Sequence, residues 1–266
     1  MGILGKKVLV LGLSKSGIAA AKFAKKQGAV VYLTEGKYVE EENMGKVEEL
    51  RSLGINVEYG AHSEEFISNA ELVVTSPGIP PHSEIIQRIK KQNIPVISEL
   101  ELAYRECDIP FIIITGTNGK TTTTALTEHI LSKSLQVKAC GNIGQPPCNI
   151  ADEGLDYFVC EASSYQLEMS PSLKPFISVW TNFTPDHIDW HQGLENYFNA
   201  KAKVFKEPQA PQFSVLNAKD EKLLEFAKQA AGEIFMFAAN IGDNCCYVEN
   251  GEIIYKRAGA AESIIK

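Results

Sequence analysis

The chain has 266 residues, more than one average domain, and 44% of them are hydrophobic, which is enough to bury a core in each of two domains. The formal net charge of -7 argues against non-specific binding to nucleic acid or anionic lipid. Phosphate binding would therefore need positive groups concentrated in particular loops. No apolar run approaches the ~20 residues that cross a bilayer, and six cysteines without C-x-x-C spacing are typical of reduced thiols in a cytoplasmic protein.

The first part of the chain alternates short β-branched runs with helical patterns. A buried strand is predicted at Val8–Leu11, followed by an alanine-rich helix at Ile18–Gln27. Further strands and helices follow: strands at Val30–Leu33, Asn56–Tyr59, Leu72–Thr75 and Pro95–Ile97, and helices near Lys46–Leu53 and at Ser83–Gln92. This alternation predicts an α/β fold whose first domain, residues 1–97, is a Rossmann-like, doubly wound parallel sheet.

The pattern restarts after a linking helix at Glu99–Arg105, and residues 98–266 are predicted to form a second, P-loop-type α/β domain. Its first strand, Phe111–Ile114, is apolar throughout, as expected for a central parallel strand covered on both faces. A loop then feeds a helix from Thr121 to about Lys133. The remaining predicted elements are strands at Gln136–Ala139, Tyr157–Cys160, Ile177–Trp180 and Phe213–Leu216, helices at about Leu194–Lys206 and Asp220–Ala230, and short strands over the last thirty or so residues.

The first glycine-rich loop, Gly12–Gly17 (GLSKSG), follows a strand and opens a helix. Backbone N–H groups and the helix dipole then point at one spot, which suits a diphosphate. The loop departs from the G-x-G-x-x-G fingerprint because Ser14 replaces the second glycine, although Glu35 stands near where a ribose-binding acid would be. A nicotinamide cofactor, another nucleotide diphosphate and an empty strand–helix turn all remain open from the residues alone.

The second glycine-rich loop, Thr115–Thr121 (TGTNGKT), lies between an apolar strand and a helix. Successive N–H groups in such a turn form a nest for anions, a lysine adds a mobile charge, and a threonine hydroxyl can ligate magnesium. It departs from the ordinary P-loop, since Ile114 stands where the first glycine would be. We predict a triphosphate site formed by Gly116, Thr117, Asn118, Gly119, Lys120, Thr121 and Thr122.

Acidic and histidine side chains follow two later strands. Glu161 comes directly after the strand Tyr157–Cys160, at the edge where doubly wound sheets bind ligands, and a carboxylate there would be a magnesium ligand or a solvated acid. The segment from Asp186 to His191 contains two histidines and two aspartates, which are candidate ligands for a zinc ion. A third anchor for a closed zinc site is missing, so one magnesium-ligating histidine with structural neighbours fits better.

Lys201 lies within an apolar stripe. In the predicted helix, Phe198 and Phe205 share its face by i, i+3, i+7 spacing. A lysine at such a position either extends its charge to water or serves chemistry. From the residues alone, we expect Lys201 to reach the solvent.

These motifs together resemble the Mur ligase family of peptidoglycan synthesis. The matching segments, which run in order and cover nearly all the chain to about residue 217, are Gly12–Gly17, Ser76–Ile79, Thr115–Thr121, Gly141–Gly144, Glu161–Glu168, Thr181–Asp189 and the helix that carries Lys201. The block Glu161–Glu168 (EASSYQLE) is the most specific, because it resembles the branch of the family that adds D-glutamate. Folylpolyglutamate synthases share the phosphate loop but are not expected to carry that block.

The resemblance implies a role for each matching position. Ser14, Lys15, Ser16, Glu35, Gly36, Ser76, Pro77 and Gly78 would bind the UDP part of UDP-N-acetylmuramoyl-L-alanine, and Asn142 and Ser163 would orient its acyl end. Thr121 and Glu161 would hold a first Mg²⁺ beside ATP, and His187 a second one, with Lys201 carbamylated into a carboxylate-like anion. Lys120, His187 and Lys201 would be the catalytic residues.

The implied reaction is phosphoryl transfer from ATP to the alanyl carboxylate, followed by attack of the D-glutamate amine on the acyl phosphate. Mur ligases also carry a third domain, and their middle domain runs past residue 266, so the resemblance implies a truncated, monomeric, cytoplasmic chain of low or no activity. Two alternatives stay open: a nicotinamide-dependent oxidoreductase that uses the first loop, and a non-catalytic nucleotide-binding module.

Overall fold

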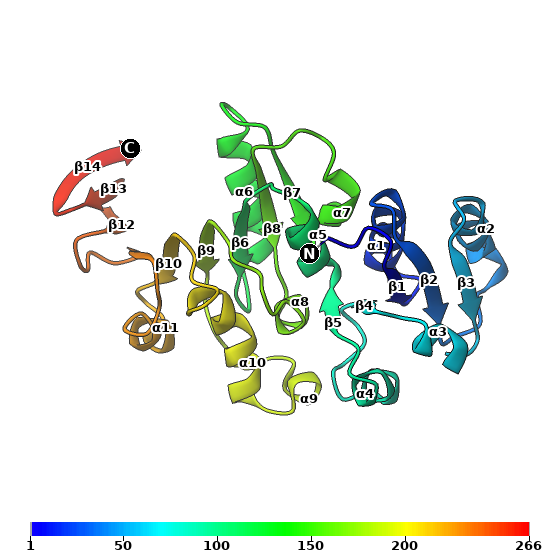
Figure 1. Ribbon diagram of the computed structural model, residues 1–266. Helices are drawn as coiled ribbons and strands as arrows, with labels where there is room; N and C mark the ends of the chain where they lie inside the picture. The colour runs from blue at the N-terminus through cyan, green and yellow to red at the C-terminus, as the bar shows by residue number, and fades with distance from the viewer. Residues whose placement is uncertain (1, 266) are drawn as a thin grey trace. The chain divides into compact units, whose positions relative to one another are not determined.

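The computed structural model describes residues 2–265 and divides into two compact units (Figure 1). The first comprises residues 2–109, 144–154 and 168–171, and the second comprises residues 110–143, 155–167 and 172–265. The predicted boundary after residue 97 lies earlier than this division. The reason is that α5 (Glu99–Glu106) buries Leu100, Leu102 and Ala103 and packs with α1 (Lys15–Lys26) and α7 (Pro147–Ile150) of the first unit.

The first unit is built on a five-stranded parallel sheet of order β3-β2-β1-β4-β5. Its strands are β1 (Lys7–Leu11), β2 (Val30–Glu35), β3 (Asn56–Tyr59), β4 (Leu72–Thr75) and β5 (Val96–Ser98). The predicted doubly wound sheet is therefore confirmed. The chain runs outward from β1 through β2 to β3 and then resumes at β4 on the other side of β1, so the switch point of the topology lies between β1 and β4.

The helices of the first unit are α1, α2 (Met44–Ser52), α3 (Glu64–Ser68), α4 (Glu84–Lys91), α5 and α7, with a 3₁₀ turn η1 at Glu41–Asn43. Leu9, Leu11, Val73 and Ile86 are fully buried together with Ile67 of α3. The sequence pattern did not predict the short α3, because one turn of helix is too short to establish a periodicity.

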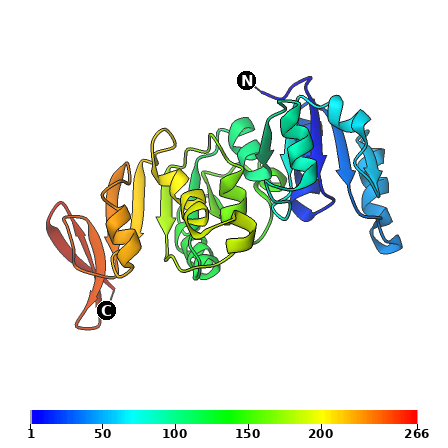
Figure 2. The ribbon, with the colours of Figure 1, turned by 90° about the horizontal axis from the view of Figure 1, so that it is seen from below.

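The second unit is built on a nine-stranded sheet of order β14-β13-β12-β11-β10-β9-β6-β8-β7. Its strands are β6 (Phe111–Thr115), β7 (Val137–Gly141), β8 (Tyr157–Glu161), β9 (Ile177–Trp180), β10 (Phe213–Asn217), β11 (Glu233–Phe237), β12 (Cys245–Glu249), β13 (Glu252–Arg257) and β14 (Ala260–Ile265). The pairs from β7 to β12 are parallel, whereas β12, β13 and β14 pair antiparallel and form the orange-to-red edge in Figure 2.

The helices of the second unit are α6 (Lys120–Leu131), α8 (Ser164–Glu168), α9 (Ile188–His191), α10 (Leu194–Ala202) and α11 (Glu221–Phe226), with a 3₁₀ turn η2 at Lys203–Phe205. Two of them are shorter than predicted. The helix expected over 194–206 ends in that 3₁₀ turn, and the one expected over 220–230 ends at Phe226. The chain then turns back, and the Ala231 amide donates a hydrogen bond to the Phe205 carbonyl over 2.8 Å. Within residues 2–265, no helix has the length and apolar character needed to span a membrane.

Candidate nucleotide-binding site

The second glycine-rich loop follows β6, a strand whose five residues are all buried. Strand β6 lies between β8 and β9 in the sheet, with Ile114 beside Glu161 and Thr115 beside Trp180. The loop therefore emerges at the carboxyl edge of the sheet, between the ends of two neighbouring strands. Ligands of open α/β sheets bind at this edge.

The amides at the start of α6 make the loop suitable for an anion. Within the part of the chain that the structure describes, the N–H groups of Gly119, Lys120, Thr121 and Thr122 have no hydrogen-bond acceptor, and the next amide, that of Thr123, donates to the Gly119 carbonyl at 3.0 Å. Gly119 adopts a left-handed φ of 80°, which glycine adopts without strain. Four unpaired amides at the positive end of a helix dipole attract a phosphate group.

Lys120 supplies the positive charge of this loop. Its Nζ donates to the carbonyl oxygens of Gly116 at 3.1 Å and Thr117 at 2.9 Å, so the ammonium lies against the loop. A phosphate could replace these neutral acceptors, because a charged acceptor binds an ammonium more strongly than a carbonyl does.

Glu161 lies opposite the start of α6 and has its carboxylate 1% exposed. Its Oε2 accepts the Thr121 hydroxyl at 2.8 Å and its Oε1 accepts the Asn142 side-chain amide at 2.8 Å. A hydroxyl beside a buried carboxylate is a set of oxygen donors that fits a hard cation such as Mg²⁺. The structure thus brings together three of the predicted site residues from the ends of β7 and β8 and from α6.

The surroundings of Lys201 correct the sequence-based expectation that its charge reaches the solvent. The residue is 2% exposed, its Nζ donates to the Gly116 carbonyl at 2.9 Å, and this nitrogen lies 4.8 Å from the centre of the Tyr197 ring. The expectation was wrong because α10 turns this face toward the phosphate loop. Burial, and then the charge of Lys120, lower the pKa of Lys201 from 10.5 to about 7.

His187 is exposed and occupies the position before α9, with a left-handed φ of 52°. Its Nδ1 lies 3.3 Å from Asp186 Oδ1. His191, in contrast, is buried, and burial followed by the charges of Lys201 and His187 lowers its pKa to about 4. Residues 2–265 contain no group of three or more His, Cys, Asp or Glu side chains that could hold a metal ion.

Ser163, predicted to orient the acyl end of the substrate, lies between β8 and α8 and is half-buried. Its hydroxyl donates to the side-chain oxygen of Gln166 at 2.9 Å, and its backbone N–H donates to the same oxygen at 3.0 Å. This local pair of bonds fixes the turn in which the serine sits.

Sequence reasoning missed the residues that hold the phosphate loop from β9. Asn182 accepts the amides of Thr117 at 3.1 Å and Asn118 at 2.9 Å, so these two N–H groups are not open to a ligand. Thr181 Oγ1 donates to the Asn118 carbonyl at 2.7 Å. A Cβ added to Gly116 would lie only 2.0 Å from Thr181 Oγ1. Gly116 therefore permits a close approach that no other residue allows. The available signal was the position of Thr181 and Asn182 directly after a predicted strand, β9.

The first glycine-rich loop lies in the first unit, at the switch point between β1 and β4. Ser14 caps α1 by accepting the Gly17 amide at 3.1 Å, which explains a serine at the second glycine position of the fingerprint. Its hydroxyl also lies 2.7 Å from Ser76 Oγ and 3.1 Å from Ser16 Oγ. Three predicted substrate-binding hydroxyls thus meet at the carboxyl edge of this sheet.

Glu35 ends β2 beside that loop, and both of its carboxylate oxygens are used by the backbone. Oε2 accepts the Leu13 amide at 2.9 Å and Oε1 accepts the Lys37 amide at 3.0 Å. A cavity of about 390 Å³ is lined here by Leu13, Glu35, Lys37, Tyr38, Val39, Glu40 and Asn43. Of the other residues predicted to bind the UDP part, Gly36 and Gly78 are exposed and Pro77 is half-buried. The side chain of Lys15 donates a hydrogen bond from Nζ to the Gly144 carbonyl.

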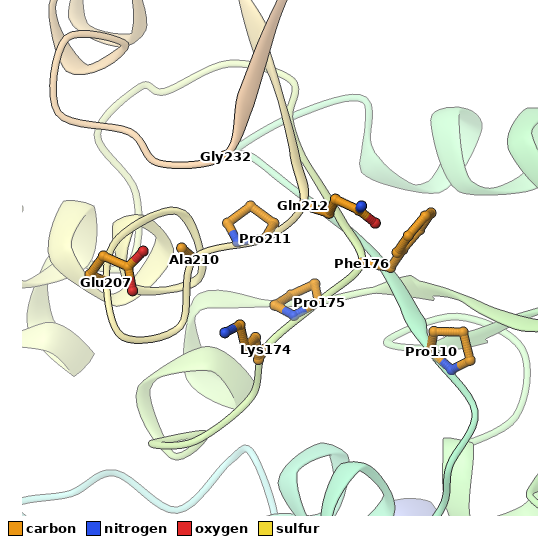
Figure 3. Close-up of a pocket in the computed structure, with 9 residues that line it drawn as sticks. All are labelled: Pro110, Lys174, Pro175, Phe176, Glu207, Ala210, Pro211, Gln212 and Gly232. Carbon is orange, nitrogen blue, oxygen red and sulfur yellow. The ribbon is translucent and has the colours of Figure 1, made fainter.

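A second cavity lies in the second unit, at the end of the sheet that faces away from the phosphate loop. Figure 3 shows its lining, which surrounds about 520 Å³ and consists of Pro110, Lys174, Pro175, Phe176, Glu207, Ala210, Pro211, Gln212 and Gly232. These residues include those that precede β6, β9 and β10, so the cavity lies at the amino ends of these strands. None of the predicted site residues lines it, and ligand sites of parallel α/β sheets lie at the other end.

Two α/β units, the second with a glycine-rich loop between a buried strand and a helix that offers open amides, define a P-loop-type nucleotide-binding architecture. The family model "Mur ligase middle domain" matches residues 114–264, and the model "Mur ligase MurD-like, N-terminal domain" matches residues 6–98. The chain belongs to the Mur ligase family.

Curated relatives agree with this assignment, and a solved structure shares the fold. The chain is 39% identical to a UDP-N-acetylmuramoylalanine–D-glutamate ligase of Thermoanaerobacter pseudethanolicus, covering 100% of this chain and 59% of the relative. It is 37% identical to the ligase of the same name from Caldicellulosiruptor saccharolyticus, covering 100% and 60%. The crystal structure of a UDP-N-acetylmuramate:L-alanyl-gamma-D-glutamyl-meso-diaminopimelate ligase from Neisseria meningitides shares the fold, with a TM-score of 0.61, 19% identity, and coverage of 97% of this chain and 86% of that one. The chain thus spans about 60% of the length of these curated relatives.

Proposed function

We propose that this chain carries the UDP-substrate-binding and ATP-binding parts of a ligase that joins D-glutamate to UDP-N-acetylmuramoyl-L-alanine. The observation that carries the proposal is the row of four unpaired amides at the start of α6, with Lys120 beside them and the buried Glu161 carboxylate opposite. The choice of D-glutamate follows the names of the curated relatives, which share 37% to 39% of their aligned residues with this chain.

In this proposal the phosphate loop binds the ATP tail. The amides of residues 119–122 bind the phosphate oxygens and the Lys120 ammonium leaves its carbonyl acceptors to bind them too. Thr121 and Glu161 would hold a magnesium ion, and His187 with a carbamylated Lys201 a second one; bound metal neutralises charge that develops on the phosphates. The Gly12–Gly17 loop, with the hydroxyls of Ser14, Ser16 and Ser76, would hold the UDP diphosphate.

The chemistry of the proposed reaction is a transfer of the terminal phosphoryl group to the alanyl carboxylate. The acyl phosphate then reacts with the amine of D-glutamate, and phosphate leaves as the new amide bond forms. The residues of this chain would contribute position and charge: Asn142 and Ser163 near the carboxylate, and Lys120 at the phosphates. A monomeric, cytoplasmic protein is part of the same proposal.

The low pKa of Lys201 supports the proposed carbamate. A carbamate forms when a neutral amine nitrogen attacks carbon dioxide, with release of one proton, and an amine whose pKa is about 7 is neutral in a substantial fraction at neutral pH. We expect ¹³C-labelled bicarbonate to give a carbamate signal in the NMR spectrum of the chain at pH 8. The Lys201→Met chain should lack this signal, while Lys203→Met, which changes a neighbouring half-buried lysine, should keep it. A signal of equal size in the Lys201→Met chain would contradict the assignment.

Binding measurements test the proposed function against the alternatives. Titrations should show that the chain binds ATP with magnesium and binds UDP-N-acetylmuramoyl-L-alanine, but binds NAD at least tenfold more weakly than the UDP substrate. The structure favours this order because Ser14, which caps α1 by accepting the Gly17 amide, stands at the fingerprint position where dinucleotide-binding loops use a glycine to let the backbone approach the pyrophosphate. Tight NAD binding without UDP-substrate binding would favour an oxidoreductase instead.

Release of ADP is the second measurement. We expect little or no ADP formation from ATP and UDP-N-acetylmuramoyl-L-alanine, with or without D-glutamate, because the chain spans only about 60% of the relatives' length. Release at the rate of a full-length relative would contradict this expectation, although it would support the ligase chemistry. Binding of both ligands without turnover would leave a nucleotide-binding module as the activity of this chain.

A further inference from the structure

The turn that carries His187 has an unusual backbone. His187 and Gln192, which flank the four-residue helix α9, have left-handed φ angles of 52° and 57°. Each non-glycine residue in this conformation costs about 1 kcal/mol or more. Such a turn persists only when contacts outside it hold it in place.

Two side-chain hydrogen bonds tie this turn to neighbouring helices, α8 and α10. His191 Nε2 lies 2.9 Å from Ser164 Oγ, and the two residues are 6% and 1% exposed. Within the turn, the His191 amide donates to the His187 carbonyl at 3.2 Å, and the side chain of Asn196 in α10 donates to the His191 carbonyl at 2.9 Å. The bond to Ser164 is therefore the link between the turn and the first residue of α8.

Ring contacts support the same link. The ring of Tyr165, the residue after Ser164, has its centre 4.9 Å from that of His187 and 4.4 Å from that of Trp190. It is also stacked on the His191 ring at 5.7 Å. The first two residues of α8 thus contact the turn by one hydrogen bond and three aromatic contacts.

We infer that His191 is a positioning residue: its hydrogen bond to Ser164 fixes the turn that presents His187 beside the phosphate loop. This inference rests on the proposed function, which makes His187 a metal ligand. His187 Nδ1 lies near Asp186, whereas its Nε2 makes no hydrogen bond within residues 2–265, so Nε2 is the nitrogen available to a cation. A Ser164–His191 nucleophilic pair is the competing interpretation, and the burial of both side chains speaks against it, because a substrate could not reach the hydroxyl.

The test uses Mn²⁺ as the probe, with the non-hydrolysable ATP analogue adenylyl imidodiphosphate present, and measures free Mn²⁺ by electron paramagnetic resonance. His191→Phe keeps a ring in the buried space and removes the hydrogen bond, so the Mn²⁺ dissociation constant should rise about tenfold, as for other groups that orient a metal ligand. His191→Gln places an amide near the position of Nε2 and should restore most of the affinity. Ser164→Ala should weaken binding like His191→Phe, and the double variant should be no weaker than either single one.

The exposed His82, in the first unit, provides the matched control: His82→Phe should leave Mn²⁺ binding unchanged. Thermal unfolding of each variant separates positioning from folding. Unchanged Mn²⁺ affinity in His191→Phe would overturn the inference and leave the proposed function standing. A loss of affinity that follows a lowered unfolding temperature and is not restored by glutamine would overturn it too, since His191 would then be structural only. Wild-type chain that binds no Mn²⁺ with the analogue would overturn the proposed function, and the role of His191 with it.

Discussion

Replacing Lys120 with methionine is expected to weaken ATP binding by about 10- to 100-fold, which corresponds to the loss of a hydrogen bond between charged groups. Methionine keeps an unbranched apolar side chain and removes the ammonium. In the structure this ammonium donates to the carbonyls of Gly116 and Thr117, neutral acceptors that a charged phosphate can replace. Isothermal titration with ATP and magnesium measures the effect.

Lys133 gives the control for this experiment. It is exposed and lies two residues beyond Leu131, the last residue of α6, so Lys133→Met removes the same charge far from the open amides at the start of this helix. ATP affinity should stay at the wild-type value in this variant. Equal affinities of Lys120→Met and wild-type chain, at equal thermal stability, would show that the loop is not the ATP site. The four unpaired amides would then need another explanation.

Replacing Glu99 with glutamine should stabilise the chain at alkaline pH by about 3 kcal/mol relative to wild type. Glu99 begins α5 and is 3% exposed. Its Oε1 accepts the Cys148 amide at 2.7 Å, but its Oε2 has no hydrogen-bond partner within residues 2–265. Burial raises the pKa of Glu99 from 4.5 to about 7, and the bond from Cys148 opposes this shift only in part.

The sign of the pH dependence follows from the pKa of Glu99 in the unfolded chain, 4.5, and in the folded chain, about 7. A folded-state pKa above the unfolded one means that the fold favours the protonated acid. The contribution of Glu99 to the free energy of unfolding is then fully present below pH 4.5 and is lost as the pH rises to 7 and beyond. Glutamine cannot ionise, so the difference between variant and wild type should grow with pH across this range. Urea unfolding at several pH values between 4.5 and 8.5 measures this difference.

Glu84 provides the matched control, because it is also the first residue of a helix, α4, but is exposed. Glu84→Gln changes the charge at a helix start without changing a buried acid, so its stability relative to wild type should vary little with pH. A Glu99→Gln difference that stays constant from pH 4.5 to 8.5 would mean that Glu99 ionises in the folded chain as readily as in water.

The sequence alone determined the local architecture of both units. Apolar runs such as Phe111–Ile114, followed by glycine-rich loops and helices, predicted parallel α/β sheets, because a strand buried on both faces and a left-handed loop position each require particular residue types. The motif Thr115–Thr121 and the resemblance to Mur ligases also followed from residues adjacent in the chain. The positions of the short helices α3, α8 and α9 did not, since a single turn shows no periodicity.

Only the tertiary structure decided which distant residues surround the phosphate loop. Asn182 holds two loop amides and Lys201 is buried against Gly116 because β6 lies between β8 and β9, and the register of those strands is a property of the assembled sheet. The expectation that Lys201 reaches solvent failed for this reason: a helical stripe reveals which side chains share a face, but not what that face packs against. The burial of Glu99 has the same origin, since its partner Cys148 is far away in the chain. Sequence determines local conformation through nearest neighbours, whereas burial and pKa depend on contacts that exist only after folding.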